Sequence, residues 1–104
     1  MENRPYNAVF MPKARKDIND ICDYISLELN SPEAAERLID KIQTEVERVC
    51  EFPFSRPLLA DNILMSKGYR YILVNNFNVF YNIKDQTIFI QRVLYGRRNY
   101  EMLL

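Results

Sequence analysis

Arginine and tyrosine side chains are concentrated in the last third of this 104-residue chain, which contains no histidine. The tripeptide Gly68-Tyr69-Arg70 opens this region, and residues 92–100 close it with three arginines and two tyrosines. Arginine holds phosphate through paired hydrogen bonds, and aromatic rings stack on unpaired bases. These residue types therefore make nucleic acid the first substrate to consider.

The formal charge of the whole chain is zero, but the charges are unevenly distributed. Residues 1–66 carry eight basic and twelve acidic side chains, a balance of −4, whereas residues 67–104 carry six and two, a balance of +4. This asymmetry predicts a basic face beside an acidic helical half, which suits a local anionic ligand better than broad coating of DNA. Salt bridges between the two halves are the alternative.

Length and composition predict one domain over residues 1–104. Two glycines and 48% hydrophobic residues are typical of an ordinary folded chain. No apolar run approaches the roughly 20 residues of a membrane span, and no signal peptide is recognisable, so we expect a cytoplasmic protein with no membrane partner. Cys22 and Cys50 fall on apolar helix faces, where buried thiols are expected. No metal-ligand spacing or cofactor motif is present.

The first half of the chain predicts one strand and two helices. A short β-prone run at residues 6–10 ends before Pro12. Apolar residues spaced by threes and fours predict amphipathic helices over residues 13–29 and 32–51. The tight link at residues 30–33 makes the helices antiparallel, so that they form a hairpin covering a sheet.

The second half predicts an antiparallel meander. Residues 52–67 form a two-proline loop with room for a short strand from residue 58, and loops of this length often line sites. Strands are expected at residues 69–74, 77–83 and 87–94, joined by two hairpin turns. Period-two alternation places one face of the last strand on Ile88, Ile90, Arg92 and Leu94. The expected fold class is α+β, ending in a short C-terminal segment.

This order of elements and motifs resembles the RelE/ParE family of bacterial type II toxins over nearly the whole chain. The resemblance is carried by the helix pair broken at residues 30–35, the loop beginning at Phe52-Pro53, the Gly68-Tyr69-Arg70 tripeptide and residues 92–100. It implies a small α+β toxin that a cognate antitoxin neutralises by wrapping an extended or helical segment around it. It also implies that operator DNA is bound only through the toxin–antitoxin complex.

The family divides by target. RelE-like members cut mRNA in the ribosomal A site, whereas ParE-like members block DNA gyrase without hydrolysis. Our leading interpretation is a ribosome-dependent mRNA endoribonuclease that arrests translation. A gyrase inhibitor is the main alternative, and a degenerate toxin that acts only as the antitoxin's co-repressor partner is a second one.

Cleavage of RNA by 2′-OH attack needs proton transfer and stabilisation of a pentacovalent phosphate. The resemblance assigns catalytic roles to Arg70, Arg97, Arg98 and Tyr100. For Arg70 the structural alternative is a salt bridge to a helix acid. For Arg97 and Arg98 it is a solvated tail or an antitoxin contact, and for Tyr100 it is packing near the C-terminus.

Arg92 and Tyr95 would complete the site from the sheet as substrate-binding residues, and Lys67, just before Gly68, is a third candidate for substrate binding. Two features of the chain weaken the nuclease interpretation. Many relatives carry histidine at the position of Tyr95, and the lysine cluster that RelE-like enzymes place before Gly68 is replaced here by Leu58, Leu59, Ala60, Asp61 and Asn62. Neutral total charge also differs from the basic character of ribosome-binding toxins.

Overall fold

A mixed four-stranded sheet forms the centre of the protein, and the computed structural model describes residues 6–96 and 103–104. The strand order is β1 (Asn7–Phe10), β4 (Thr87–Tyr95), β3 (Phe77–Lys84) and β2 (Arg70–Val74). The predicted antiparallel meander is confirmed for β2, β3 and β4. The parallel pairing of β1 with β4, which joins the two ends of the chain, was not predicted.

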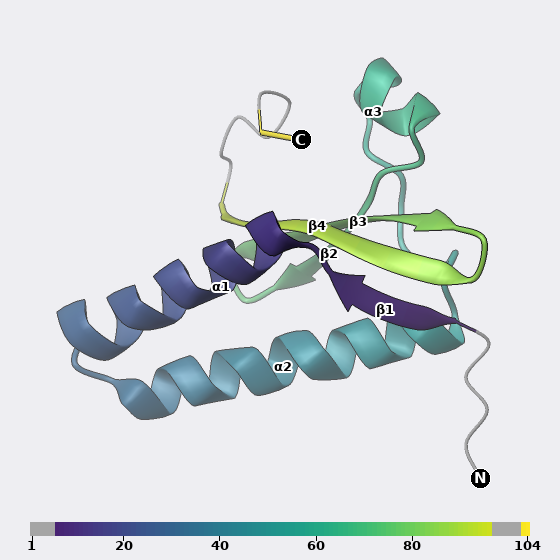
Figure 1. The fold of residues 1–104 in the computed structure, drawn as a ribbon. Coiled ribbons are helices and arrows are strands. Elements are labelled where there is room, and N and C mark those ends of the chain that lie inside the picture. Colours follow the sequence, from purple (N-terminus) through teal and green to yellow (C-terminus); the bar gives the residue numbers. More distant parts are fainter. Residues whose placement is uncertain (1–5, 97–102) are drawn as a thin grey trace, which may run out of the picture.

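The predicted helical hairpin is confirmed and covers one face of the sheet (Figure 1). α1 (Pro12–Asp23) continues directly into a π-helical turn, η1 (Tyr24–Glu28), and α2 (Pro32–Glu51) returns alongside. Proline at the start of each helix supplies a backbone angle already suited to the first turn. The end of the hairpin, where η1 meets α2, extends past the edge of the sheet (Figure 1).

The loop between α2 and β2 contains a short helix where the sequence left room for a strand. α3 (Asn62–Ser66) begins because the Asp61 carboxylate accepts a hydrogen bond from the Leu64 backbone N–H at 3.0 Å. Strand character is limited to one isolated bridge between Leu58 and Arg70. α3 lies on the side of the sheet opposite the hairpin (Figure 1), and the buried Leu64 attaches it there.

Buried side chains form one cluster on each face of the sheet. The hairpin-face cluster lies between the sheet and the two long helices and contains Ala14, Leu38, Ile42, Val46, Val49, Cys50, Ile72, Val74, Val79, Tyr81, Ile88, Ile90 and Val93. The α3-face cluster is smaller and contains Leu59, Leu64, Tyr69, Phe80 and Leu94. In the described ranges no helix has the length and apolar character to cross a membrane.

A β-bulge interrupts the pairing of β3 with β4. Tyr81 lies opposite Ile90 and Phe80 lies opposite Arg92, so Gln91 is an extra residue in β4. An extra residue in one strand breaks the period of two and changes which side chains share a face. Arg92 therefore leaves the strand on the face of Phe80 and not among the core residues of the hairpin face, although its guanidinium reaches Asp17 of α1.

The bulge makes the predicted alternation in β4 wrong beyond its middle. Ile88 and Ile90 do face the hairpin, but Val93 takes the position expected for Arg92, and Leu94 belongs to the α3-face cluster. On β3, which has no extra residue, the predicted shared face of Phe77, Val79, Tyr81 and Ile83 is confirmed.

The two cysteines lie at opposite ends of the hairpin and are not joined by a disulfide. Cys50 is buried as predicted, whereas Cys22 is only partly buried. Burial and the neighbouring Asp23 carboxylate raise the pKa of the Cys22 thiol. The antiparallel arrangement of the helices therefore keeps the thiols apart.

The buried phenol of Tyr81 makes the stability of the protein depend on pH. The Tyr81 side chain is fully buried, and burial raises the pKa of its phenol from 10.0 to about 12, although the Arg70 and Arg56 cations oppose this shift. Above pH 10 the unfolded chain loses this proton first, so stability decreases as the pH rises towards 12. Between pH 9 and pH 11 we expect the wild type to lose about 1.4 kcal/mol more free energy of unfolding than Tyr81→Phe.

Urea unfolding of both proteins at the two pH values measures this difference. Tyr95→Phe, which changes an exposed tyrosine, serves as the control and should follow the wild type. Parallel curves for the wild type and Tyr81→Phe would contradict the prediction.

Candidate functional site

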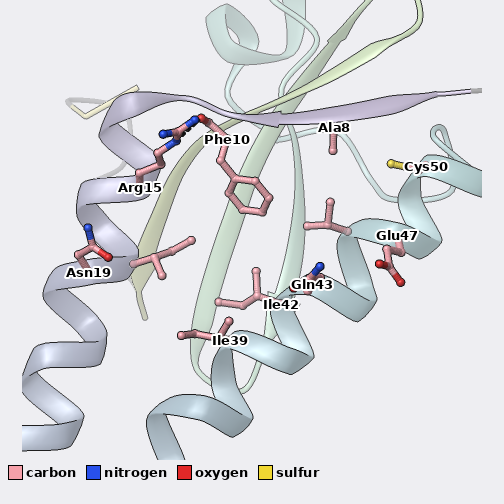
Figure 2. Close-up of a pocket in the computed structure, with 11 residues that line it drawn as sticks. Ala8, Phe10, Arg15, Asn19, Ile39, Ile42, Gln43, Glu47 and Cys50 are labelled. Carbon is pink, nitrogen blue, oxygen red and sulfur yellow. Dashed lines mark hydrogen bonds between the residues drawn. The ribbon is translucent and has the colours of Figure 1, made fainter.

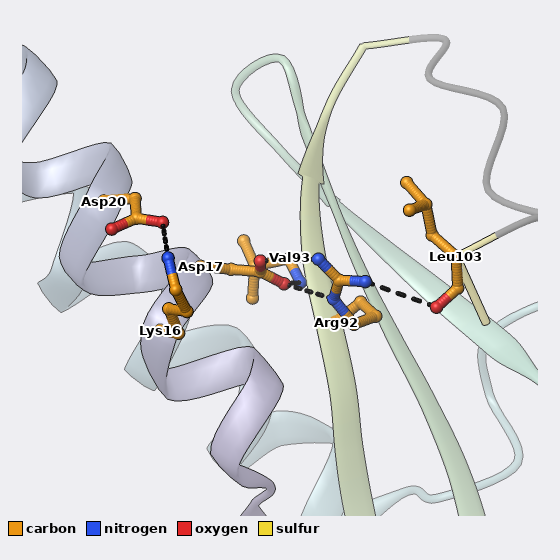
Figure 3. A network of polar contacts seen from close by, with 6 residues as sticks. All are labelled: Lys16, Asp17, Asp20, Arg92, Val93 and Leu103. Carbon is orange, nitrogen blue, oxygen red and sulfur yellow. Dashed lines mark hydrogen bonds and ion pairs between the residues drawn. The ribbon is translucent and has the colours of Figure 1, made fainter.

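Arg92 is held in a network that links the sheet to α1 (Figure 3). Its guanidinium donates to the Asp17 carboxylate through Nε at 2.7 Å and Nη2 at 2.8 Å, a bidentate arrangement. Its Nη1 donates to the Leu103 carbonyl oxygen at 3.2 Å. The side chains of Arg92 and Asp17 are only 16% and 12% exposed, so this ion pair is largely withdrawn from water.

The Asp17 carboxylate also accepts a hydrogen bond from the unpaired edge of β4. β1 stops pairing at Phe10, opposite Ile90, so the next part of β4 has no strand beside it. The Val93 backbone N–H on this edge donates to Asp17 Oδ2 at 2.9 Å. The hydrogen bond from Arg92 to Asp17 raises the pKa of the guanidinium. Arg92 therefore anchors α1, and its predicted role in substrate binding stays untested.

Arg70 begins β2 on the hairpin face, where it lies opposite Tyr81. Its Nη1 donates to the Arg56 carbonyl oxygen, and its guanidinium carbon stands 5.2 Å from the centre of the Phe54 ring, in cation–π contact. The helix-acid alternative does not hold within residues 6–96 and 103–104, because no carboxylate there pairs with Arg70. Part of the guanidinium is left available to an anion, and its predicted catalytic role is untested.

Glu45 on α2 pairs instead with Arg56, whose Nη2 is 2.6 Å from Glu45 Oε1, and with the exposed Arg48. We call Glu45, Phe54, Arg56, Arg70 and Tyr81 the arginine corner. Arg56 Nε and the Tyr81 hydroxyl are buried there with no hydrogen-bond partner among the described atoms. The corner is thus cationic, partly buried and backed by a neutral phenol.

The other predicted site residues lie elsewhere. Tyr95, at the end of β4, is exposed and packs edge-on against Phe77 with ring centres 5.2 Å apart. Lys67 is exposed at the C-terminal end of α3. Arg97, Arg98 and Tyr100 lie outside the described residues, so their predicted roles stay predictions.

The described candidates do not converge on one site. Arg70 is on the hairpin face of an edge strand, whereas Arg92 is on the α3 face, two strands away. Tyr95 pairs with Phe77 at the start of β3, four residues before Tyr81 of the arginine corner. A nuclease needs its phosphate ligands and its proton donor around one phosphorus atom. The described part of the chain shows no such cluster, and no group of three or more potential metal-ligating side chains occurs in it.

A groove of about 460 Å³ lies between β1, α1 and α2 (Figure 2). Its floor is apolar and its rim carries the polar side chains of Arg15, Asn19, Gln43 and Glu47. The remaining lining residues are Ala8, Phe10, Ile18, Ile39, Ile42, Val46 and Cys50. An apolar floor with a polar rim suits the side chains of a bound peptide segment better than a phosphate.

The family to which the chain belongs follows from comparison with known proteins. Residues 8–100 match the model of the ParE toxin of type II toxin-antitoxin system, parDE. The chain belongs to the ParE toxin family. A solved chain from the "Chromosomal ParDE TA system from P. aeruginosa" has the same fold, with a TM-score of 0.70, 19% identity and coverage of 91% of this chain and 100% of that one. None of the curated proteins matches.

The RelE/ParE resemblance is therefore confirmed for the family as a whole, and the match is to its ParE branch. Sequence reasoning missed the two residues that organise this ParE-family fold locally. Asp17 was placed on the polar face of its helix, and Arg56, between two prolines, was treated as part of an irregular loop. The only signal for either was its oppositely charged partner, which lies 75 positions away for Asp17 and 11 positions away, across a helix end and a proline, for Arg56.

Removal of the Asp17 carboxylate should destabilise this ParE-family protein strongly. Asp17→Ala leaves the Arg92 guanidinium and the Val93 N–H without their partner, so we expect a loss of about 3 kcal/mol in the free energy of unfolding. Urea unfolding measures it. Asp20→Ala, which breaks the exposed Lys16–Asp20 pair on the same helix, is the matched control and should change little.

The double variant Asp17→Ala/Arg92→Met should recover part of the lost stability, because no unpaired buried charge remains. Equal small effects of Asp17→Ala and Asp20→Ala would show that the network does not hold α1 to the sheet.

Proposed function

We propose that this ParE-family toxin acts by binding DNA gyrase and blocking it without hydrolytic chemistry. The observation that carries the proposal is the match of residues 8–100 to the ParE toxin model. Members of this branch block gyrase, whereas mRNA cleavage belongs to the RelE branch. The proposal replaces our leading interpretation from the sequence, the ribosome-dependent endoribonuclease, with its main alternative. It also expects a cytoplasmic site of action.

The geometry of the described cations supports this choice. A binding protein needs complementary surfaces, whereas a nuclease needs its groups assembled around one atom. Arg92 is committed to Asp17, and Arg70 contacts Phe54 and a backbone carbonyl on the other face of the sheet. The neutral total charge likewise offers little of the counterion release that strengthens binding to ribosomal RNA.

Two assays in parallel test the proposal. Antitoxin-free toxin should inhibit DNA supercoiling by purified gyrase and should leave a defined mRNA uncut on programmed ribosomes, as scored by primer extension. New A-site cuts that disappear in Arg70→Ala would instead restore the endoribonuclease interpretation. Absence of both activities, together with unimpaired growth on expression, would favour the degenerate toxin.

We further propose that the cognate antitoxin uses the groove between β1, α1 and α2. The family description names a toxin–antitoxin system, so a partner protein is expected. The groove presents an apolar floor to a segment with apolar side chains, and the Arg15 and Glu47 side chains on its rim can pair with charges on that segment. Operator DNA would be bound only by the assembled complex.

Ile39→Glu tests the groove. Ile39 lines it and is 40% exposed, so the protein should remain folded while a carboxylate is placed where an apolar side chain would bind. We expect antitoxin affinity measured by titration calorimetry to fall about tenfold or more, with gyrase inhibition unchanged. Ile63→Glu, on α3, is the matched control. Equal affinity for both variants would exclude the groove.

A further inference from the structure

We propose that the tip of the helical hairpin, residues 20–36, is the surface with which the toxin docks on its target protein. We also infer that the target presents an apolar socket bordered by lysine and arginine side chains. The inference rests on the proposed function, because it takes the toxin to act by binding a protein. It adds the location of the contact and the chemistry of the partner surface.

Three large apolar side chains are exposed at the tip. Leu27 is 76% exposed, and Tyr24 and Leu29 are each 57% exposed. None of the three belongs to either core cluster, whereas Ile21 and Ile25 from the same segment pack on the hairpin-face cluster. Ile21 and Ile25 attach this segment to the core, so the fold does not need the three exposed side chains for that contact. An exposed group of apolar side chains that the fold does not use is typical of a protein-interaction surface.

The charge around these side chains indicates which kind of partner surface is complementary. Residues 20–36 contain five acidic side chains and no basic one: Asp20, Asp23, Glu28, Glu33 and Glu36. Asp20 pairs with Lys16 at 2.7 Å, and within the described ranges no cation pairs with the other four. Like charges repel, which disfavours nucleic-acid phosphate, an anionic membrane surface and a second copy of the same tip. A protein surface with basic side chains around an apolar pocket is complementary.

The backbone of the tip departs from regular helix. η1 is a π-helical turn in which the Leu29 N–H donates to the Tyr24 carbonyl at 3.2 Å, and Asn30 then adopts a positive φ of 53°. π-helical turns are rare and occur frequently at functional sites. After the turn the chain reverses into α2. Leu27, within the turn, and Leu29, just after it, both lie outside the core.

The exposed apolar side chains of the tip are distinct from the residues that line the groove. The tip lies at the far end of the hairpin, past the edge of the sheet (Figure 1). The arginine corner, by contrast, is formed at the end of α2 remote from the tip. Substitutions at Leu27 and Leu29 therefore change a projecting surface and leave the core and the groove intact.

The experiment compares Leu27→Ser/Leu29→Ser with the wild type and with Ile63→Ser, a matched control that removes a similarly exposed apolar side chain from α3. Inhibition of gyrase supercoiling and growth arrest on expression are both measured. We expect the tip variant to need about tenfold or more protein for half-inhibition and to lose toxicity, with the control unchanged. Thermal unfolding and antitoxin binding should match the wild type.

A second variant tests the electrostatic part. Asp23→Asn/Glu28→Gln keeps the apolar side chains and should weaken inhibition most at low salt, because exposed charges are screened as ionic strength rises. Undiminished inhibition and toxicity in Leu27→Ser/Leu29→Ser would overturn the inference while the gyrase proposal stands. A wild type that does not inhibit gyrase refutes the proposed function. Growth arrest then tests the tip separately. Loss of toxicity in the tip variant alone would support the inference, and retained toxicity would exclude it.

Discussion

The hydrogen bonds of the Asp17 carboxylate determine how the helical hairpin sits on the sheet. One carboxylate accepts two hydrogen bonds from Arg92 and one from the Val93 backbone, and all three donors belong to β4. They lie where β1 ends and the edge of β4 is left without a neighbouring strand. Because the pair is mostly withdrawn from water, loss of one member would leave a charge unpaired. The position of α1, and with it the hairpin, depends on this contact.

The β-bulge at Gln91 makes the contact possible. Without the extra residue, Arg92 would point into the hairpin-face cluster among Ile88 and Ile90, where a guanidinium has no partner. With it, Val93 fills the core position and Arg92 reaches Asp17 and the Leu103 carbonyl. Bulges often change the direction of a side chain in this way. Arg70 and Arg92, two of the basic side chains that first suggested a nucleic-acid site, are thus on different faces of the sheet.

This division bears on what a ParE-family protein of this fold can do. The helices supply an apolar groove and a projecting acidic tip, and the loop after α2 supplies a cationic corner. These are surfaces of different chemistry at different places, and our proposals assign the groove to the antitoxin and the tip to the target.

The sequence by itself determined the two long helices, the strands and the family, but not the short helix α3. Periodic apolar residues and prolines located both long helices, and alternation with short polar turns located the three meander strands, because local patterns report which face of an element is buried. The parallel pairing of β1 with β4, the bulge and the Asp17–Arg92 pair were decided only in the tertiary structure. The strand pairing and the ion pair join residues about 75 or more positions apart, as in the contact between Asp17 and Arg92. The bulge lies within a hairpin, but the alternation of residue types in β4 gives no sign of the extra residue. Local pattern carries no information on such contacts, and the assignment of Arg92 to a substrate site was made without knowing its partner.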